Sequence, residues 1–391
     1  MGNSAKWDET VTVREIPVTR LAAIGWLVFA LVAAGMVAWE LKMRSIGLEA
    51  GDLDDSKAHW AVERRKIAAG DWDDIAIIGA SRILFDTNLD AWQEVTGRRP
   101  IQLALAGTNP RPFLNDFADN PDFKGLLVVG VTPDVFFSDW LGIPTFAGVL
   151  DYWKDESPSD RFGHQAGLIL SRRLAFLDSD YTLMKLIDQV NIPNRGGIVR
   201  PYLDVWKVWQ TTDDRQTSLW SGIENNERLR EHARLTWGPF DGKAMDPEGI
   251  ARACMEASEA VKKIRARGGE VVFVRPPSAG LYYEHEQRAA PRAKTWDRLL
   301  EETGSFGIFF DDYPEMRGLE VPEWSHLSRD SSLKFTRAYA TVLAREVPWL
   351  HSRLRKEPEL RAAMGRNARA YAEETFPIEK TAAVFDEILT Q

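Results

Sequence analysis

The sequence predicts an α/β protein with a doubly wound, mostly parallel five-stranded sheet flanked by helices. Five short apolar runs alternate with helical stretches along the chain. Each run is continuously apolar, whereas a half-exposed strand would alternate apolar and polar residues, so the runs are typical of strands buried on both faces. The chain of 391 residues is 44% hydrophobic and 27% charged, so it can bury one large core or two modest ones. In chain order the runs are 74–81, 99–107, 125–133, 269–277 and 307–313.

An uncharged run, LAAIGWLVFALVAAGMVAW (residues 21–39), precedes the first predicted strand. As a helix it would be about 28 Å long, which matches the hydrocarbon thickness of a bilayer. It therefore predicts a single transmembrane anchor. A cleaved signal peptide would have a shorter apolar region and leader, and a buried helix of a soluble protein would have a polar face, so these two alternatives are less favoured.

Charge and cysteine content exclude some classes of function. The net charge of -9 argues against a general nucleic-acid role, because phosphate contacts need a basic face. Cys254 is the single cysteine, so neither an intrachain disulfide nor a cysteine metal cluster can form, and we predict no metal site and no cofactor. Basic residues are balanced on the two sides of the apolar run, so their count does not decide its orientation.

The α/β domain is expected to contain an insertion at 138–250, with helices such as SRRLAFLDSDYTLMKLIDQV (171–190). We expect this insertion to cap the strand ends and form one wall of a cleft. Its tryptophans either pack this cap or offer a platform to a sugar ring. The chain as a whole is predicted to have five parts: a cytoplasmic segment (1–20), the anchor (21–39), a linker or helical stalk (40–69), the α/β domain (70–350) and a helical tail (351–391).

Polar residues follow each of the five predicted strands. Ligands of parallel sheets bind at the carboxyl ends of the strands, so the five strand ends are expected to converge on one site. The residues concerned are Ser81 and Arg82, then Gly107, Thr108, Asn109 and Arg111, then Thr132 and Asp134, then Arg275, and finally Glu323 and His326.

This set contains the residue types of nucleophilic catalysis. A serine hydroxyl attacks only when an imidazole takes its proton, and the imidazole needs an acceptor on its other nitrogen. Ser81, His326 and Glu323 can fill these roles, with a plain turn as the alternative role of Ser81. Gly107 leaves room for a main-chain N–H near a developing oxyanion, and Asn109 offers a side-chain donor.

Two arginines belong to the same predicted site. Arg82 and Arg275 are candidate substrate-binding residues, each able to hold a carboxylate, a sugar hydroxyl or a structural acidic partner.

The arrangement of Ser81, Gly107 and a carboxylate-x-x-His-Leu segment resembles the SGNH (GDSL-like) hydrolase superfamily, whose fold is flavodoxin-like. More narrowly, it is similar to membrane-anchored members that O-acetylate bacterial surface polysaccharides. The resemblance covers about residues 70–348, and its most specific piece is EWSHLSRDSSLKFTRAYATVL (323–343). It implies Ser81 as nucleophile, Gly107 as oxyanion donor, His326 as base and Glu323 as its orienter, in place of the usual aspartate.

One block departs from the family pattern. The family has G-x-N-D after the third strand, whereas this chain reads GVTPD (130–134) and lacks the asparagine. Asn109 is the candidate substitute as an oxyanion donor.

The resemblance implies an extracytoplasmic acyltransferase, anchored in the bacterial inner membrane, that moves an acetyl or similar group onto a glycan hydroxyl. Because acyl-CoA is cytoplasmic, it also implies a multi-span membrane acyltransferase as partner. A glycan O-acetyl esterase and a catalytically silent, glycan-binding scaffold are the alternatives. Residues 360–389 resemble the closing helices of GT-B-fold glycosyltransferases, although a generic amphipathic helix would have the same composition.

Overall fold

The computed structural model describes residues 20–70, 74–140, 142, 146–182, 207–237 and 243–350. Residues 1–19 of the cytoplasmic segment predicted at 1–20 lie outside these residues, and so does the helical tail predicted at 351–391. Within them, the predicted α/β fold with a five-stranded parallel sheet is confirmed, in the order β2-β1-β3-β6-β7. The strands are β1 (Ile75–Ile78), β2 (Ile101–Gln102), β3 (Leu126–Gly130), β6 (Glu270–Arg275) and β7 (Gly307–Phe309).

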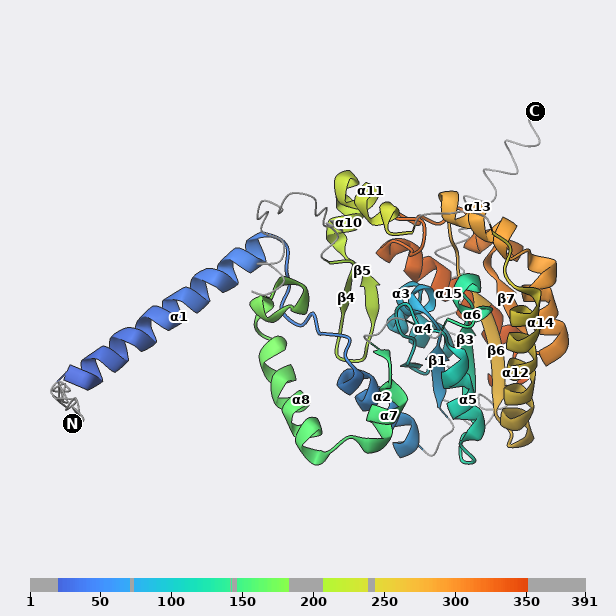
Figure 1. The fold of residues 1–391 in the computed structure, drawn as a ribbon, viewed down its shortest axis with the longest axis horizontal. Coiled ribbons are helices and arrows are strands. Elements are labelled where there is room, and N and C mark those ends of the chain that lie inside the picture. Colours follow the sequence, from blue (N-terminus) through green and yellow to red (C-terminus); the bar gives the residue numbers. More distant parts are fainter. Residues whose placement is uncertain are drawn as a thin grey trace, which may run out of the picture.

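Helices cover both faces of the sheet (Figure 1). Helix α12 packs on both α5 and α14 on one face, and α4 and α15 pack together on the other. This double cover explains why β1 and β3 are apolar and buried at every position. The principal helices are α1 (Leu21–Ser45), α2 (Lys57–Ala69), α3 (Ser81–Asp86), α4 (Leu89–Thr96), α5 (Arg111–Asp119), α6 (Pro133–Phe136), α12 (Pro247–Ala266), α13 (Gly280–Ala289), α14 (Trp296–Thr303) and α15 (Arg329–Glu346).

Two glycines let α3 begin directly over the sheet. A Cβ atom on Gly79 would lie 2.3 Å from Ile83 Cγ2 and 3.1 Å from Gly130 Cα, so only glycine fits between β1, β3 and α3. Gly79 also has a φ of +157°. The first residue of α3 is Ser81, which is thereby held at the end of β1.

The described part of the helical insertion expected at 138–250 differs from the expectation in two respects. An antiparallel hairpin forms from β4 (Trp209–Thr211) and β5 (Thr217–Leu219). The helix expected over 171–190 is absent between Arg172 and Thr182, where 3₁₀ turns η3 (Ala175–Leu177) and η4 (Ser179–Tyr181) occur, and 183–190 lie outside the described residues. The other described helices of the insertion are α7 (Val149–Asp155), α8 (Pro158–Ser171), α10 (Ser221–Asn225) and α11 (Glu227–Leu235).

Asp178 gives the physical reason for the missing helix. Its side chain accepts the N–H of Asp180 at 2.9 Å and also pairs with Lys207 Nζ at 2.6 Å. A side chain that bonds its own neighbouring main chain offers the backbone an alternative to the helix. The apolar spacing of this segment contains no information about these contacts.

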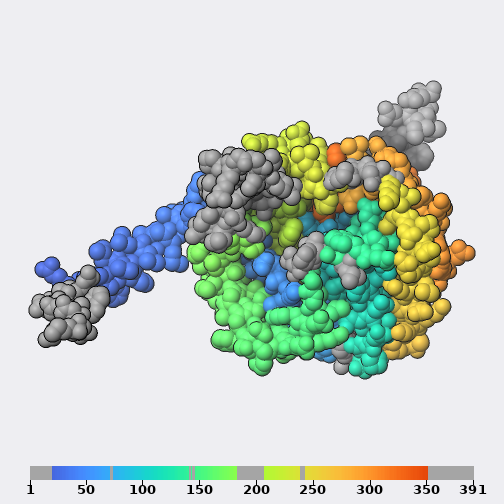
Figure 2. Space-filling model, viewed as in Figure 1, coloured from blue at the N-terminus to red at the C-terminus, as the bar shows by residue number. Residues whose placement is uncertain are grey.

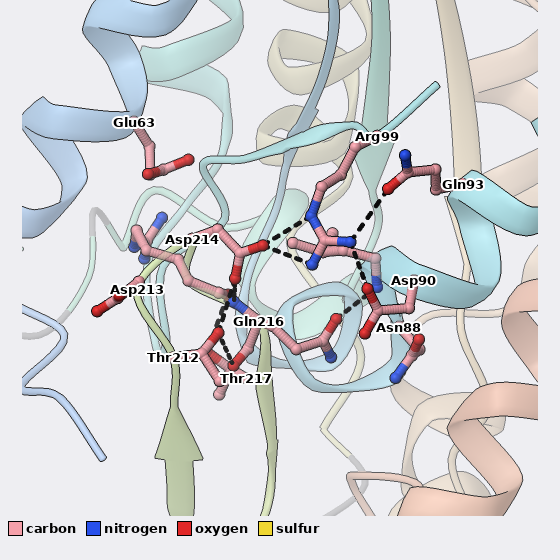
Figure 3. Close-up of polar contacts among 12 residues, drawn as sticks. Glu63, Asn88, Asp90, Gln93, Arg99, Thr212, Asp213, Asp214, Gln216 and Thr217 are labelled. Carbon is pink, nitrogen blue, oxygen red and sulfur yellow. Dashed lines mark hydrogen bonds and ion pairs between the residues drawn. The ribbon is translucent and has the colours of Figure 1, made fainter. Parts of the chain in front are cut away.

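The tip of the hairpin docks onto α4 and the segment that leads to β2. Figure 3 shows Asp214 facing Arg99, whose Nε donates to Asp214 Oδ2 at 2.7 Å, while Arg99 also contacts Asp90 and Gln93. Asp214 Oδ1 accepts the hydroxyl of Thr212 at 2.7 Å. The hairpin is therefore joined to the α/β domain by a charged network.

Arg215, also at the hairpin tip, covers the edge of the sheet. It is fully buried, pairs with both carboxylate oxygens of Asp55 at 2.7 and 2.9 Å, and donates to the carbonyls of Gln102 and Ala104 at 2.8 Å each. The indole N–H of Trp60 on α2 donates to the carbonyl of Leu103 at 2.9 Å. The carbonyls of Gln102, the last residue of edge strand β2, and of the two residues after it are thus satisfied, and Arg215 covers two of them at the edge of the sheet.

The N-terminal helix α1 is long and apolar enough to span a membrane, and its apolar stretch is not buried by the rest of the protein. It projects away from the body (Figure 1). Its C-terminal end docks, because Glu40 Oε1 and Oε2 accept the N–H groups of Ala175 and Phe176 at 3.1 and 2.9 Å. Met43 is buried at the same junction.

Candidate functional site

The candidate site lies where the strand order reverses, between β1 and β3. In a doubly wound sheet this point opens a crevice at the carboxyl ends of the strands. Ser81 occupies the β1 side at the start of α3 and is half-buried. Thr132 and Asp134 occupy the β3 side at the start of α6.

Glu323 and His326 lie together, as their spacing predicts. Glu323 is fully buried and its Oε1 lies 3.0 Å from His326 Nδ1. The ring N–H is not aimed at this oxygen, which instead accepts the main-chain N–H of His326 at 2.6 Å. The other oxygen, Oε2, accepts the indole N–H of Trp237 at 2.5 Å. Both carboxylate oxygens are therefore held in place beside the imidazole.

Aromatic rings enclose the imidazole of His326. Phe85 stacks on it with ring centroids 4.1 Å apart, and Trp237 contacts it edge-on at 5.6 Å. Its segment is joined to α3, because Asp86 Oδ1 accepts the N–H of Leu327 at 2.9 Å. The side chain of His326 is only 2% exposed, so any charge on the imidazole is poorly solvated.

Ser81 begins α3, and the imidazole of His326 packs against the same helix, but the two side chains form no hydrogen bond. Phe85, the stacking partner of the imidazole, follows Ser81 by one helical turn, a separation of about 5–6 Å between Cβ atoms. Neither ring nitrogen of His326 has a hydrogen-bond partner among the described residues, so Ser81 Oγ does not hydrogen-bond to the imidazole in this structure. Catalytic hydrogen bonds often tighten only when substrate is bound.

The structure places Gly107 and Asn109 in the turn after β2. Gly107 has a φ of +56°, in the left-handed region that favours glycine. The side chain of Asn109 is fully buried, and its Nδ2 donates to the carbonyls of Ser138 and Trp140 at 3.1 Å each. Both amide hydrogens of Asn109 thus hold the loop after α6, which leaves no spare side-chain donor for an oxyanion.

Arg82 and Arg275 converge on one buried carboxylate, Glu286 of α13. Arg82 Nη1 lies 2.7 Å from Oε1 and Arg275 Nη2 lies 2.8 Å from Oε2, with Ser278 Oγ also donating to Oε2 at 2.6 Å. Burial opposes ionisation of Glu286, but the two guanidinium groups and the hydroxyl outweigh it and lower its pKa to about 2. Both arginines thus have the structural acidic partner that was one of their predicted roles. Arg82 also lies over the Tyr282 ring, 4.4 Å from its centroid.

Two further carboxyl groups face this cluster. Burial raises the pKa of Asp134, and the nearby charge of Glu286 adds to the rise despite the opposing effect of Arg82. Burial likewise raises the pKa of Asp86 well above its ordinary value, with a smaller contribution from the charge of Glu323. The region therefore combines one strongly ionised carboxylate with two carboxyl groups that ionise less readily than in water.

The sequence did not identify several residues that the structure brings to the site. Trp237 was expected only as one of the tryptophans of the insertion, although its indole bonds Glu323. Asp86 and Glu286 were not among the predicted site residues. Asp86 does carry a signal, since it is the one carboxylate in the short SRILFD helix that packs on the sheet. Glu286 carries none, because its partner Arg82 is 204 residues away in the chain. Among the described residues, no cluster of three or more histidine, cysteine or acidic side chains is arranged to hold a metal ion.

Comparison with models of protein families gives no match for this chain, and neither does comparison with curated protein sequences.

Proposed function

We propose that the chain is a membrane-anchored serine acyltransferase that places an acetyl or similar acyl group on a glycan hydroxyl. The observation that carries the proposal is the buried Glu323–His326 pair, whose carboxylate is bonded from both sides and whose imidazole stacks on Phe85, one turn along α3 from Ser81. A carboxylate beside an imidazole and a serine at a strand end are the parts of an acyl-transfer site. The resemblance to SGNH hydrolases of polysaccharide O-acetylation suggests the acyl group and the acceptor.

In the proposed reaction, His326 takes the proton of Ser81 Oγ as the oxygen bonds the acyl carbonyl carbon. The tetrahedral intermediate collapses, the donor leaves with the proton from His326, and an acyl ester remains on Ser81. A glycan hydroxyl then gives its proton to His326 and attacks this ester. His326 returns the proton to Ser81 Oγ as the ester bond breaks, which releases Ser81 and forms the acylated glycan. The main-chain N–H groups near Ser81 and Gly107 are the proposed oxyanion donors. A multi-span membrane acyltransferase is the proposed supplier of the acyl group.

A glycan-binding scaffold without catalysis is the second candidate. Two observations favour it: both amide hydrogens of Asn109 are engaged, and a cavity of ≈ 410 Å³ lies elsewhere, between the hairpin and α15. The cavity is lined largely by polar side chains suited to sugar hydroxyls, among them Asn88, Gln210, Gln216 and Arg329.

Release of p-nitrophenol from p-nitrophenyl acetate by the full-length protein in detergent micelles tests the proposal. We expect release that depends on Ser81, and acylated product when an oligosaccharide acceptor is added. Release without any acylated acceptor would identify the glycan esterase. A folded protein that releases no p-nitrophenol would instead support the scaffold.

The proposal also places the large domain outside the cytoplasm. A reporter that is active only outside the cytoplasm, fused after Gln391, is expected to be active in cells, and Met1 is expected on the mature chain. Activity of a cytoplasmic reporter at the same position would contradict the proposal, because the acceptor glycan would then be on the other side of the membrane.

A further inference from the structure

Helix α8 exposes an apolar face on its outer side. Phe162, Ile169 and Leu170 are 77%, 51% and 55% exposed, and a spacing of seven and eight residues places them on one side of a helix. Leu168 is buried against the body. The outward face is therefore the apolar one, which is the reverse of a surface helix in water.

The C-terminal end of this face lies beside the end of the apolar run of α1. Glu40 is the first charged residue after that run, and it follows Trp39, a residue type that favours the membrane–water boundary. The carboxylate of Glu40 accepts the N–H groups of Ala175 and Phe176 in η3. The turn that follows α8 is thus held at the level where α1 changes from apolar to polar.

An apolar groove continues from α1 onto this turn. It has a volume of ≈ 400 Å³ and lies between α1 side chains from Phe29 to Leu41 and the side chains of Leu174 and Phe176. Glu40 is its one polar lining residue. Leu177 of η3 adds a further exposed apolar side chain at this end of α8.

We propose that α8 and η3 form a second membrane contact, which rests in the interfacial layer of the leaflet where α1 ends, with lipid acyl chains in the groove. In Figures 1 and 2, α8 lies at the side of the body from which α1 projects. Arg173 follows α8 at the anchor end, and its long side chain can extend to lipid headgroups. Amphipathic helices that lie in an interface bury an apolar face of this kind.

The inference rests on the membrane placement of α1 made in the proposed function, and the test separates the two. Single cysteines are introduced in the full-length protein as Phe162→Cys on α8, Leu31→Cys on α1, and Met255→Cys on α12. Met255 is the matched control, because it is also apolar and 53% exposed but lies on a helix that packs on α5 and α14, away from α1. The native Cys254 is buried, so unmodified protein reports the background labelling.

Each variant is labelled with an NBD fluorophore and placed in nanodiscs of phosphatidylcholine and phosphatidylglycerol, with or without nitroxide-bearing lipids. We expect the nitroxide lipids to lower NBD emission about two-fold or more at positions 31 and 162, and to leave position 255 unchanged. Quenching at 31 but not at 162 would overturn the second contact and keep the anchor. A blue-shifted but unquenched probe at 162 would identify a protein cover, such as a second copy of the chain, and would also overturn it. No quenching at 31 would overturn the membrane placement itself.

Discussion

Replacement of Ser81 by alanine is expected to abolish acyl transfer, with a loss of about 10³-fold or more in kcat. The exchange removes the proposed nucleophile and keeps a small side chain at the first position of α3, so the free energy of unfolding should change little. The measurement is the rate of p-nitrophenol release and of acceptor acylation by full-length protein. Ser258→Ala is the matched control, because among the described residues its hydroxyl bonds the carbonyl of Glu302 on α14 alone, and its loss should leave both rates unchanged.

His326→Ala is expected to be as severe as Ser81→Ala, since members of a catalytic unit act together. Trp237→Phe should be milder, because it keeps the ring beside His326 but removes the N–H that holds Glu323 Oε2. A hydrogen bond to a charged group contributes about 1.5–3 kcal/mol, so kcat should fall by about 10- to 100-fold with little change in KM. This effect should vanish in the Ser81→Ala background. Wild-type acylation by folded Ser81→Ala protein would instead leave Ser81 as a turn residue and favour the scaffold.

Replacement of Glu286 by glutamine is expected to destabilise the α/β domain by about 3–5 kcal/mol at pH 7. The variant leaves the guanidinium groups of Arg82 and Arg275 buried without their shared negative charge. The measurement is the denaturant midpoint of full-length protein in micelles. Glu94→Gln is the matched control, because Glu94 pairs with Arg337 at 2.9 Å on the exposed surface, where such a pair contributes about 0–1 kcal/mol.

The stability difference between wild type and Glu286→Gln is also expected to depend on pH. The pKa of Glu286 falls from an ordinary 4.5 to about 2 in the folded protein. Its stabilising effect is therefore complete above about pH 4.5 and is lost as the pH falls toward 2, a total of about 3 kcal/mol. The difference in stability between wild type and Glu286→Gln should shrink across this window. A difference that stays constant from pH 7 to pH 3 would show that the carboxylate charge is not what stabilises the cluster.

The sheet was predictable because its strands are buried on both faces and therefore occur in the sequence as continuous apolar runs. The pairing of Glu323 with His326 was also predictable, since the two residues are only three positions apart in the chain. Long-range partners were not. Glu286 meets Arg82 across 204 residues and Trp237 meets Glu323 across 86, and local pattern contains no signal for either contact. The hairpin was missed because its strands are three residues each, too short for a period to appear.

The docking of α1 on η3 would determine how far the proposed active site can reach. A protein on a flexible tether explores a volume, and the effective concentration of its site toward acceptors falls as the tether lengthens. Here the carboxylate of Glu40 joins α1 to the body directly after the apolar run, so the distance from bilayer to Ser81 is set by the fold and not by a tether. Acceptor hydroxyls at one height above the lipid would be within range, and longer glycans would have to fold back or be acylated as they emerge. Chain position, and not sugar identity alone, would then decide which residues of a polymer are modified.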